Sequence, residues 1–398
     1  MILNRSVLSW CLYDLANTIF AMNMTSYHFP VWLVAERGCP ELYYSLAFGG
    51  SMLVSALMMP RLGQRSDRTG RRVPLMVFWT LNCVALTAAL SFVGPIPLVL
   101  TVFAMANFCY QLAGVFYNAL LPTVAPSEQM GRVSGYGVSL GYVGTLIGIL
   151  ITGPIAASLG RQATFVPTAL LFLLLAMPSF FWVREDSRGW HKPPDEDLRE
   201  RLRPLLPSAF LGLSAVGTAI LFMSVYAKKA VGLSDRDLHH FLTICTLVTI
   251  AGSVGWGRVT DRLGGYRSLW WVWLAWALAF GLAALSFHPL LFMGVGMLSG
   301  IALAGTWVTS RVLLVELIGP ARIGETFGLF GLVSRIAAVA GPVAWALLIW
   351  VGAPLGMSRY RLGMVMLLGF TLAGWRLYHR LPASVRGGSA KMELSVTT

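Results

Sequence analysis

Long apolar runs alternate with short polar stretches along almost the whole chain. Each run has about 20 residues or more, which is the length that crosses the hydrocarbon core of a bilayer as an α-helix. The runs cover residues 7–34, 41–60, 73–93, 97–121, 133–158, 161–183, 204–227, 238–257, 268–287, 290–317, 326–351 and 357–379. The pattern predicts an all-α membrane protein with twelve transmembrane helices.

The longest internal polar stretch, residues 184–203, separates the first six runs from the last six. It contains Pro193, Pro194 and a mixture of acidic and basic residues. We therefore expect a six-helix bundle over residues 1–183, a linker over 184–203 and a second bundle over 204–380. The polar segment 381–398 is expected to be a disordered tail.

An internal repeat relates the two halves. Asp261 follows Asp67 by 194 positions, and the pair Gly324 and Gly328 follows Gly131 and Gly135 by 193 positions. These anchors lie at different points of each half, yet their offsets agree within one residue. The agreement predicts two pseudo-symmetric bundles that arose by duplication.

Composition supports a membrane protein. Hydrophobic residues make up 56% of the chain and charged residues 12%, whereas globular domains carry roughly 25% charged residues. The mean hydropathy is +0.69. A soluble protein could not cover such a chain with polar side chains, but lipid tails solvate an apolar surface.

The net charge of +13 comes mostly from arginines between the apolar runs. Most of them fall on one side of the membrane if the N-terminus lies inside, so the positive-inside bias predicts cytoplasmic termini and a cytoplasmic linker. The sequence contains no basic soluble segment with interleaved aromatic residues, the pattern that would indicate nucleic-acid binding. The five cysteines form no CxxC pair, and no metal site is predicted.

One polar segment between the second and third apolar runs has the pattern Gly-x-x-x-Asp-Arg-x-Gly-Arg-Arg, formed by Gly63, Asp67, Arg68, Gly70, Arg71 and Arg72. This pattern resembles a signature of the major facilitator superfamily. A degenerate copy spans Gly257–Arg267. The resemblance implies a major facilitator fold in which two bundles alternate access to a site lined by the first, fourth, seventh and tenth helices.

Other segments resemble the vacuolar-effluxer-like branch, the family of the autophagy-related vacuolar amino-acid exporter of yeast. They are residues 10–17, 116–122, 135–142, 310–311 and 325–342. Leu15 stands where the family has Trp, and the seventh span lacks the family's Asn-Asp-Gly segment. The resemblance implies export of a small polar solute, amino acids first. The loops are shorter than in fungal members, which suggests a bacterial inner-membrane protein.

Asp14 and Arg311 are the first candidates for a transport role. Asp14 lies about 10 Å into the first span, where an ionisable group faces a cavity or is paired. It could be a gate charge, a proton-binding site or a structural hydrogen-bonding group. The resemblance places Asp14, Asn118 and Arg311 on one cavity, as a gate between bundles. Alternatively, Arg311 pairs with Glu316 or extends to the interface.

Further polar residues share helix faces within the predicted spans. Each could contact a small polar substrate or form a hydrogen bond between helices, and both readings stay open. These candidates for substrate binding or gating are Asn17, Asn107, Tyr110, Gln111, Ser214, Thr218 and Trp307.

The signature segment has a different predicted role. A carboxylate is stabilised near a helix N-terminus, and the resemblance places Asp67 at residues 324–327 and Asp261 at residues 131–133. Such contacts would break when the transporter switches. The expected conformational latch comprises Asp67, Arg68, Gly70, Arg71, Asp261 and Arg262, with Arg68, Arg71 and Arg72 also favouring anionic lipid heads.

Arg335 in the eleventh span is expected to carry a structural charge. Its nearest acids in sequence are Glu316 and Glu325. We therefore predict an ion pair that holds the tenth and eleventh spans together.

The sequence as a whole predicts a secondary transporter that exports a small polar, amino-acid-like solute. No nucleophile or paired-acid motif indicates an enzyme, and no cofactor is expected beyond protons that could couple through Asp14. The expected partners are the substrate and membrane lipids, for a monomeric protein. Alternatives are an exporter of lipids, amphiphiles or metal ions, and a non-transporting membrane sensor or scaffold with the same fold.

Overall fold

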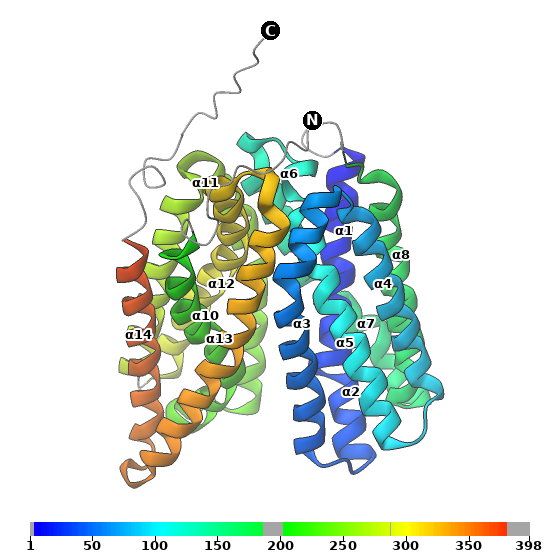
Figure 1. Ribbon diagram of the computed structural model, residues 1–398. Helices are drawn as coiled ribbons and strands as arrows, with labels where there is room; N and C mark the ends of the chain where they lie inside the picture. The colour runs from blue at the N-terminus through cyan, green and yellow to red at the C-terminus, as the bar shows by residue number, and fades with distance from the viewer. Residues whose placement is uncertain (1–3, 186–201, 287, 380–398) are drawn as a thin grey trace. The chain divides into compact units, whose positions relative to one another are not determined.

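The computed structural model describes residues 4–185, 202–286 and 288–379. Within these residues every regular element is a helix (Figure 1). The predicted linker and tail lie mostly or entirely outside the described residues. The chain forms two compact units, an N-terminal unit of Met1–Pro194 with Pro320–Arg335 and a C-terminal unit of Asp195–Gly319 with Ile336–Thr398. Helix α13 therefore contributes its first part to the N-terminal unit and its remainder to the other.

The N-terminal unit contains the first six predicted spans. Its long helices are α1 (Arg5–Phe20), α3 (Glu41–Thr69), α4 (Arg72–Ala89), α5 (Ile96–Ala119), α7 (Met130–Leu159) and α8 (Phe165–Trp182). Short segments join them, namely α2 (His28–Val31), α6 (Leu121–Val124), η3 (Leu90–Phe92), η4 (Ser127–Gln129) and η5 (Arg161–Thr164). Proline or glycine stands beside the helix ends at Pro40, Gly70, Pro95 and Gly160, as expected for residues that interrupt helices.

The first predicted span is irregular. After α1 the chain forms the π-helix η1 (Ala21–Ser26), then α2, then the π-helix η2 (Trp32–Glu36). Tyr27 breaks the helical backbone at φ −131° and ψ −81°. Pro30 explains the break, because it has no N–H to bond the carbonyl of Ser26 and its ring crowds that carbonyl.

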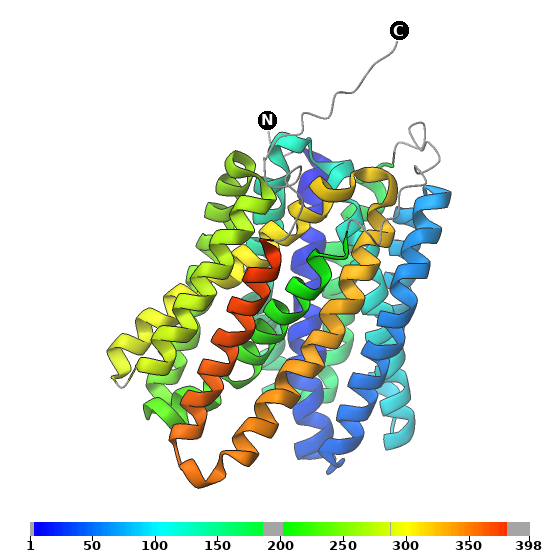
Figure 2. The same ribbon diagram turned by 60° about the vertical axis from the view of Figure 1, so that its left-hand side comes forward.

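The C-terminal unit contains α10 (Leu205–Tyr226), η7 (Ala227–Val231), α11 (Asp235–Leu285), α12 (Pro289–Ile318), η9 (Ala353–Leu355) and α14 (Ser358–Tyr378). Helix α11 packs against α12, and α14 packs against α10 (Figure 2). Gly264 interrupts α11 at φ 80° and ψ 162°, so α11 holds both the eighth and the ninth predicted spans. The 3-10 turn η8 (Pro320–Arg322) leads into α13 (Ile323–Val351).

Nine helices of the described residues are long and apolar enough to cross a membrane, and α11 counts among them once. Twelve spans result when α11 is counted as two and the irregular first span and α14 are added. The predicted fold class, an all-helical membrane protein of the twelve-helix type, is therefore confirmed.

A glycine face of α7 packs directly against α1. A Cβ atom at Gly144 would lie 2.5 Å from the carbonyl oxygen of Leu15, and one at Gly137 would lie 2.7 Å from the Trp10 ring. Gly153, farther along the same helix, has open space around it. Small residues in the middle of the fifth span thus let the backbones of α1 and α7 approach each other closely.

Candidate functional site

Most of the signature segment is helical rather than a loop. Helix α3 continues to Thr69, and α4 begins at Arg72. Gly70 ends α3 in the left-handed conformation, at φ 62° and ψ 20°. Glycine suits this position because a Cβ atom would be strained there. The tight turn brings Arg72 back toward Asp67.

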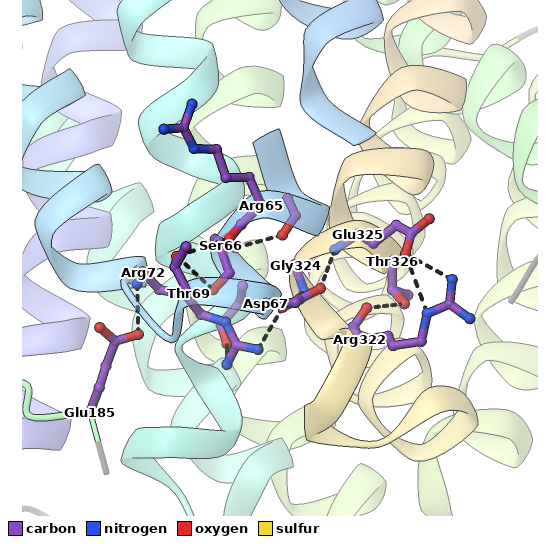
Figure 3. A network of polar contacts seen from close by, with 12 residues as sticks. Arg65, Ser66, Asp67, Thr69, Arg72, Glu185, Arg322, Gly324, Glu325 and Thr326 are labelled. Carbon is purple, nitrogen blue, oxygen red and sulfur yellow. Dashed lines mark hydrogen bonds and ion pairs between the residues drawn. The ribbon is translucent and has the colours of Figure 1, made fainter. Parts of the chain in front are cut away.

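Asp67 binds the start of α13 (Figure 3). Its Oδ1 accepts a hydrogen bond of 2.9 Å from Gly324 N, and its Oδ2 accepts one of 2.8 Å from Glu325 N. The contact expected between Asp67 and residues 324–327 is therefore present. Unpaired N–H groups and the helix dipole favour a carboxylate at this end of a helix. The corresponding contact of Asp261 stays a prediction.

Arg72 supplies the charge that balances Asp67. Its Nη2 lies 2.7 Å from Asp67 Oδ1, and only 1% of Arg72 and 5% of Asp67 are exposed. The prediction that Arg72 belongs with the lipid-facing arginines is therefore wrong, whereas Arg68 and Arg71 are exposed. The five-residue spacing between Asp67 and Arg72 across a glycine turn was the available sequence signal.

Facing glycines allow α3 and α13 to touch through their backbones. A Cβ atom at Gly63 would lie 2.1 Å from the carbonyl oxygen of Gly324, and one at Gly328 would lie 2.5 Å from the carbonyl oxygen of Met59. Because real Cβ atoms never come so close, a side chain at either position would push the helices apart. The close packing of α3 against α13 thus requires glycine at position 63, which the sequence motif did not reveal.

Glu185 was not predicted as a site residue, yet it caps α4. Its carboxylate accepts hydrogen bonds from Arg72 N at 2.8 Å and Val73 N at 3.0 Å. Burial raises the pKa of Glu185, and the hydrogen bonds from Val73 N and Arg72 N oppose this shift in part. No local motif marks this contact, because Glu185 follows α8 and lies far from α4 in sequence.

A second group of polar side chains lies inside the N-terminal unit. Arg335 on α13 donates a short hydrogen bond from Nη2 to Gln111 Oε1 on α5. The hydroxyl group of Tyr110 lies beside the side chain of Asn17 on α1. The Tyr110 ring stacks on Phe20, with 4.6 Å between ring centroids and 28° between planes. Asn17, Tyr110, Gln111 and Arg335 form what we call the Arg335 cluster.

Other predicted residues of this unit do not join the cluster through a described bond. Asn107 donates to the Ser51 hydroxyl at 2.8 Å and is fully buried. Asn118 donates to the carbonyl of Gly114 on its own helix. The Asp14 carboxylate packs against α7, 3.2 Å from where a Cβ atom of Gly137 would stand. The same helical faces therefore supply both helix-packing contacts and the cluster.

The candidates in the C-terminal unit mostly take packing roles. Thr218 donates to the carbonyl of Ser214, and both are buried where a Cβ atom at Gly341 would come within 2.5 Å of the Thr218 hydroxyl oxygen. Trp307 and Arg311 lie partly buried on α12. Whether Arg311 shares a site with Asp14 and Asn118 stays a prediction.

The predicted ion pair of Arg335 is wrong. Glu325 pairs with Arg322 at 2.9 Å, and Glu316 accepts a hydrogen bond of 2.8 Å from Gly265 N. Arg335 instead contacts the neutral Gln111. Sequence proximity was a poor guide, because the acids nearest in sequence are bonded to groups nearer to them in space.

Comparisons with known proteins agree with this architecture. The family model described as Major Facilitator Superfamily matches residues 15–234 and 205–396. An uncharacterized protein of Aquifex aeolicus is 27% identical over 373 residues, covering 93% of this chain and 95% of the relative. The uncharacterized MFS-type transporter YxiO of Bacillus subtilis is 24% identical over 399 residues, covering 92% of this chain and 93% of the relative.

A named efflux pump matches part of the chain. The multidrug efflux pump Tap of Mycolicibacterium fortuitum is 33% identical over 174 residues, covering 43% of this chain and 41% of the pump. Among solved structures, a bacterial homologue of the iron transporter ferroportin has a TM-score of 0.75 at 16% identity, covering 95% of this chain and 99% of that one. The human organic anion transporter MFSD10 also has a TM-score of 0.75 at 16% identity, covering 94% and 99%. At this identity both structures support the fold alone.

Proposed function

The chain belongs to the major facilitator superfamily of membrane transporters, and on that premise we propose that it exports a small polar solute by alternating access. The observation that carries the proposal is the Arg335 cluster. A guanidinium group, an amide and a phenol meet there inside the N-terminal unit. An ionisable side chain inside a membrane bundle is a candidate for the solute pathway, because its charge is unfavourable there without such a role.

The Asp67 contact supports the alternating-access part of the proposal. Asp67 joins the signature turn to α13 through two hydrogen bonds from backbone N–H groups. Breaking them uncovers a buried carboxylate and an unsatisfied helix end, so the contact stabilises one conformation over the other. The proposed latch also includes charged residues from both copies of the signature, namely Arg68, Arg71, Asp261 and Arg262.

The direction of transport and the branch of the superfamily are further parts of the proposal. Named efflux pumps are among the relatives, which favours export. The segments that resemble the vacuolar-effluxer-like branch favour an amino-acid-like solute. Bacterial relatives of nearly full length favour a plasma-membrane location, with both termini in the cytoplasm according to the charge bias.

A metal exporter has less support. The described residues contain no group of three or more His, Cys, Asp or Glu side chains that could hold a metal ion. His28 is bonded to the Thr152 hydroxyl at 2.8 Å instead. We therefore retain the polar organic solute as the proposed substrate.

Transport by the purified protein tests this function directly. Proteoliposomes are loaded in turn with each labelled amino acid and with the organic cation ethidium, with and without a pH gradient. We expect protein-dependent movement of at least one amino acid, faster with a proton gradient if protons drive export. Movement of no compound above protein-free liposomes would favour a sensor or scaffold, and movement of ethidium alone would remove the amino-acid-like class.

The proposed gate has its own test in the same assay. We expect Asp14→Asn and Arg311→Gln each to slow transport at least tenfold, because each variant removes one charge of the gate. The charge-swapped double variant should recover part of the rate. Wild-type rates in both single variants would contradict a gating role.

A further inference from the structure

Arg335 is a charged side chain deep in a membrane protein. It lies near the middle of α13, which has 29 residues, and apolar segments 327–333 and 336–351 lie on the two sides of the pair Ser334 and Arg335. The middle of a helix of this length lies near the midplane of the bilayer that it spans. A charge at this depth is unfavourable unless it faces water, a counter-ion or a ligand.

No acid balances this charge in the described part of the chain. Arg335 has a hydrogen bond to Gln111 and no ion pair among the described residues, and its Nε is buried without a hydrogen-bond partner. A guanidinium group has five N–H donors, so one amide oxygen leaves most of them available. Arg72 differs from Arg335 in this respect, because its Nη2 forms an ion pair with Asp67 Oδ1 at 2.7 Å.

The surroundings hold the guanidinium group in place without neutralising it. Gln111 is 94% buried, with an exposed fraction of 6%, and its Oε1 accepts from Arg335. The Tyr110 ring stacks on Phe20, and its hydroxyl group lies beside the side chain of Asn17. Within the described residues, Asn17 Oδ1 is also buried without a hydrogen-bond donor. The cluster therefore offers a fixed cation and a nearby free acceptor.

We propose that Arg335 binds the carboxylate group of the exported solute, with Gln111 orienting the guanidinium group. This inference rests on the proposed transport function and specifies the substrate class as small organic carboxylates. A planar carboxylate matches the fork of N–H donors in a guanidinium group. Asn17 Oδ1 then accepts a hydrogen bond from an N–H or O–H group of the same solute, which suits an amino acid or a hydroxy acid.

Thermal unfolding of the purified full-length protein tests binding without requiring transport. The probes are the amino acids, short mono- and dicarboxylates, the matching primary amides, ethidium, chloride and inorganic phosphate. A ligand that binds only the folded state raises the unfolding temperature. We expect one or more organic carboxylates to stabilise the protein and their amides to bind at least about tenfold more weakly, because charge-assisted hydrogen bonds are lost.

Variants separate a ligand role from a structural role. Arg335→Gln should abolish stabilisation by the carboxylate, and Arg335→Lys should retain only part of it, because a lysine keeps the charge but not the fork. The ligand-free Arg335→Gln protein should unfold at the wild-type temperature or above it, since the variant removes a partly buried charge that lacks a counter-ion among the described residues. A structural arginine would instead give a lower unfolding temperature.

Arg37→Gln is the matched control. Arg37 donates to the carbonyl of Gly94 at 2.7 Å, outside the cluster, so the variant removes the same charge and should keep carboxylate binding. Stabilisation only by ethidium, by amides as well as acids, or by chloride or phosphate alone would overturn the proposal, and so would unchanged carboxylate binding in Arg335→Gln. Absence of any carboxylate effect together with measurable transport of another solute would reject this inference and leave the transport function standing.

Discussion

The two copies of the signature share a glycine with positive φ and differ in side-chain chemistry. Each copy turns at a glycine with positive φ, Gly70 at 62° and Gly264 at 80°. These glycines are separated by the same 194 positions as Asp67 and Asp261. The common offset places the turn, as well as the acid, in the duplicated pattern.

The residue two positions after each glycine shows the difference. In the first copy it is Arg72, which pairs with Asp67 at 2.7 Å. In the second copy it is Tyr266, which stacks on Tyr378 with 4.7 Å between ring centroids. The Tyr378 hydroxyl also donates a hydrogen bond of 3.0 Å to the carbonyl of Tyr266.

After each turn, backbone N–H groups donate hydrogen bonds to the carboxylate of a glutamate that is distant in sequence. Glu185 accepts from Arg72 N and Val73 N in the first copy, and Glu316 accepts from Gly265 N in the second. The two copies thus share a glutamate that accepts from backbone N–H groups after the turn, while the neighbouring side chains differ. The first copy forms a charged network that reaches α13, and Tyr266 of the second copy forms an aromatic contact within the C-terminal unit.

Removal of the Asp67 charge should have the largest effect. Asp67→Asn leaves buried Arg72 without its ion pair and weakens the cap on α13, so we expect a loss of about 3–5 kcal/mol of stability. Thermal unfolding in detergent measures it. Asp67→Asn combined with Arg72→Gln should be less destabilising than the sum of the single variants. A loss below about 1 kcal/mol in Asp67→Asn would show that the pair is not effectively buried.

Gly63→Ala should be the next largest change. Its Cβ atom would overlap the carbonyl of Gly324 at 2.1 Å, which separates α3 from α13 and costs about 1–3 kcal/mol. Transport should also slow, because Asp67 then loses its contact with α13. Gly50→Ala on the same helix is the control, since its Cβ atom meets nothing within 4 Å.

Gly265→Ala extends this test to the second copy. A Cβ atom at Gly265 would lie 2.7 Å from the backbone of Leu313 on α12, so this variant should be destabilising as well. We expect it to leave the Asp67 contact intact, since Gly265 packs within the C-terminal unit. Equal transport defects at matched stability in Gly63→Ala and Gly265→Ala would contradict a special role for the first copy.

Tyr378→Phe should have a smaller effect. It removes the hydrogen bond to the carbonyl of Tyr266 and keeps the ring stack, so we expect a loss of about 1 kcal/mol. Tyr378→Leu also removes the stack and should cost about 0.5–1.5 kcal/mol more. Unfolding temperatures of the two variants measure both contributions. An unchanged temperature in Tyr378→Leu would mean that the aromatic contact does not stabilise the second turn.

The smallest expected effect is the pH dependence of the Glu185 cap. Burial raises the pKa of Glu185, so the folded protein binds this proton more tightly than the unfolded chain does. Its favourable contribution is complete below the unfolded pKa of about 4.3 and is lost as the pH rises through the higher folded value. When the pH rises from 4 to 7, the unfolding temperature of the wild type should therefore fall relative to that of Glu185→Gln. A constant difference would contradict the raised pKa.

The helices and their number could be predicted because the signals are local. Twenty-residue apolar runs, prolines and glycines at their ends, and the 194-residue repeat are all present in the printed chain. The irregular first span was less predictable in detail, although Pro30 explains its break at Tyr27. The position of Asp67 at α13 was accessible only through the family resemblance, since the two segments are 257 residues apart.

The sequence by itself determined which segments enter the membrane, where the chain turns and which residues carry charge, because these depend on length, hydropathy and backbone preference. Only the tertiary structure decided which charges are balanced. Arg72 is paired, Glu185 caps a helix and Arg335 contacts an amide, and each outcome depends on partners from distant parts of the chain. Burial and partnership arise when helices pack, so no local pattern distinguishes the arginine that pairs with a carboxylate from the one that contacts an amide.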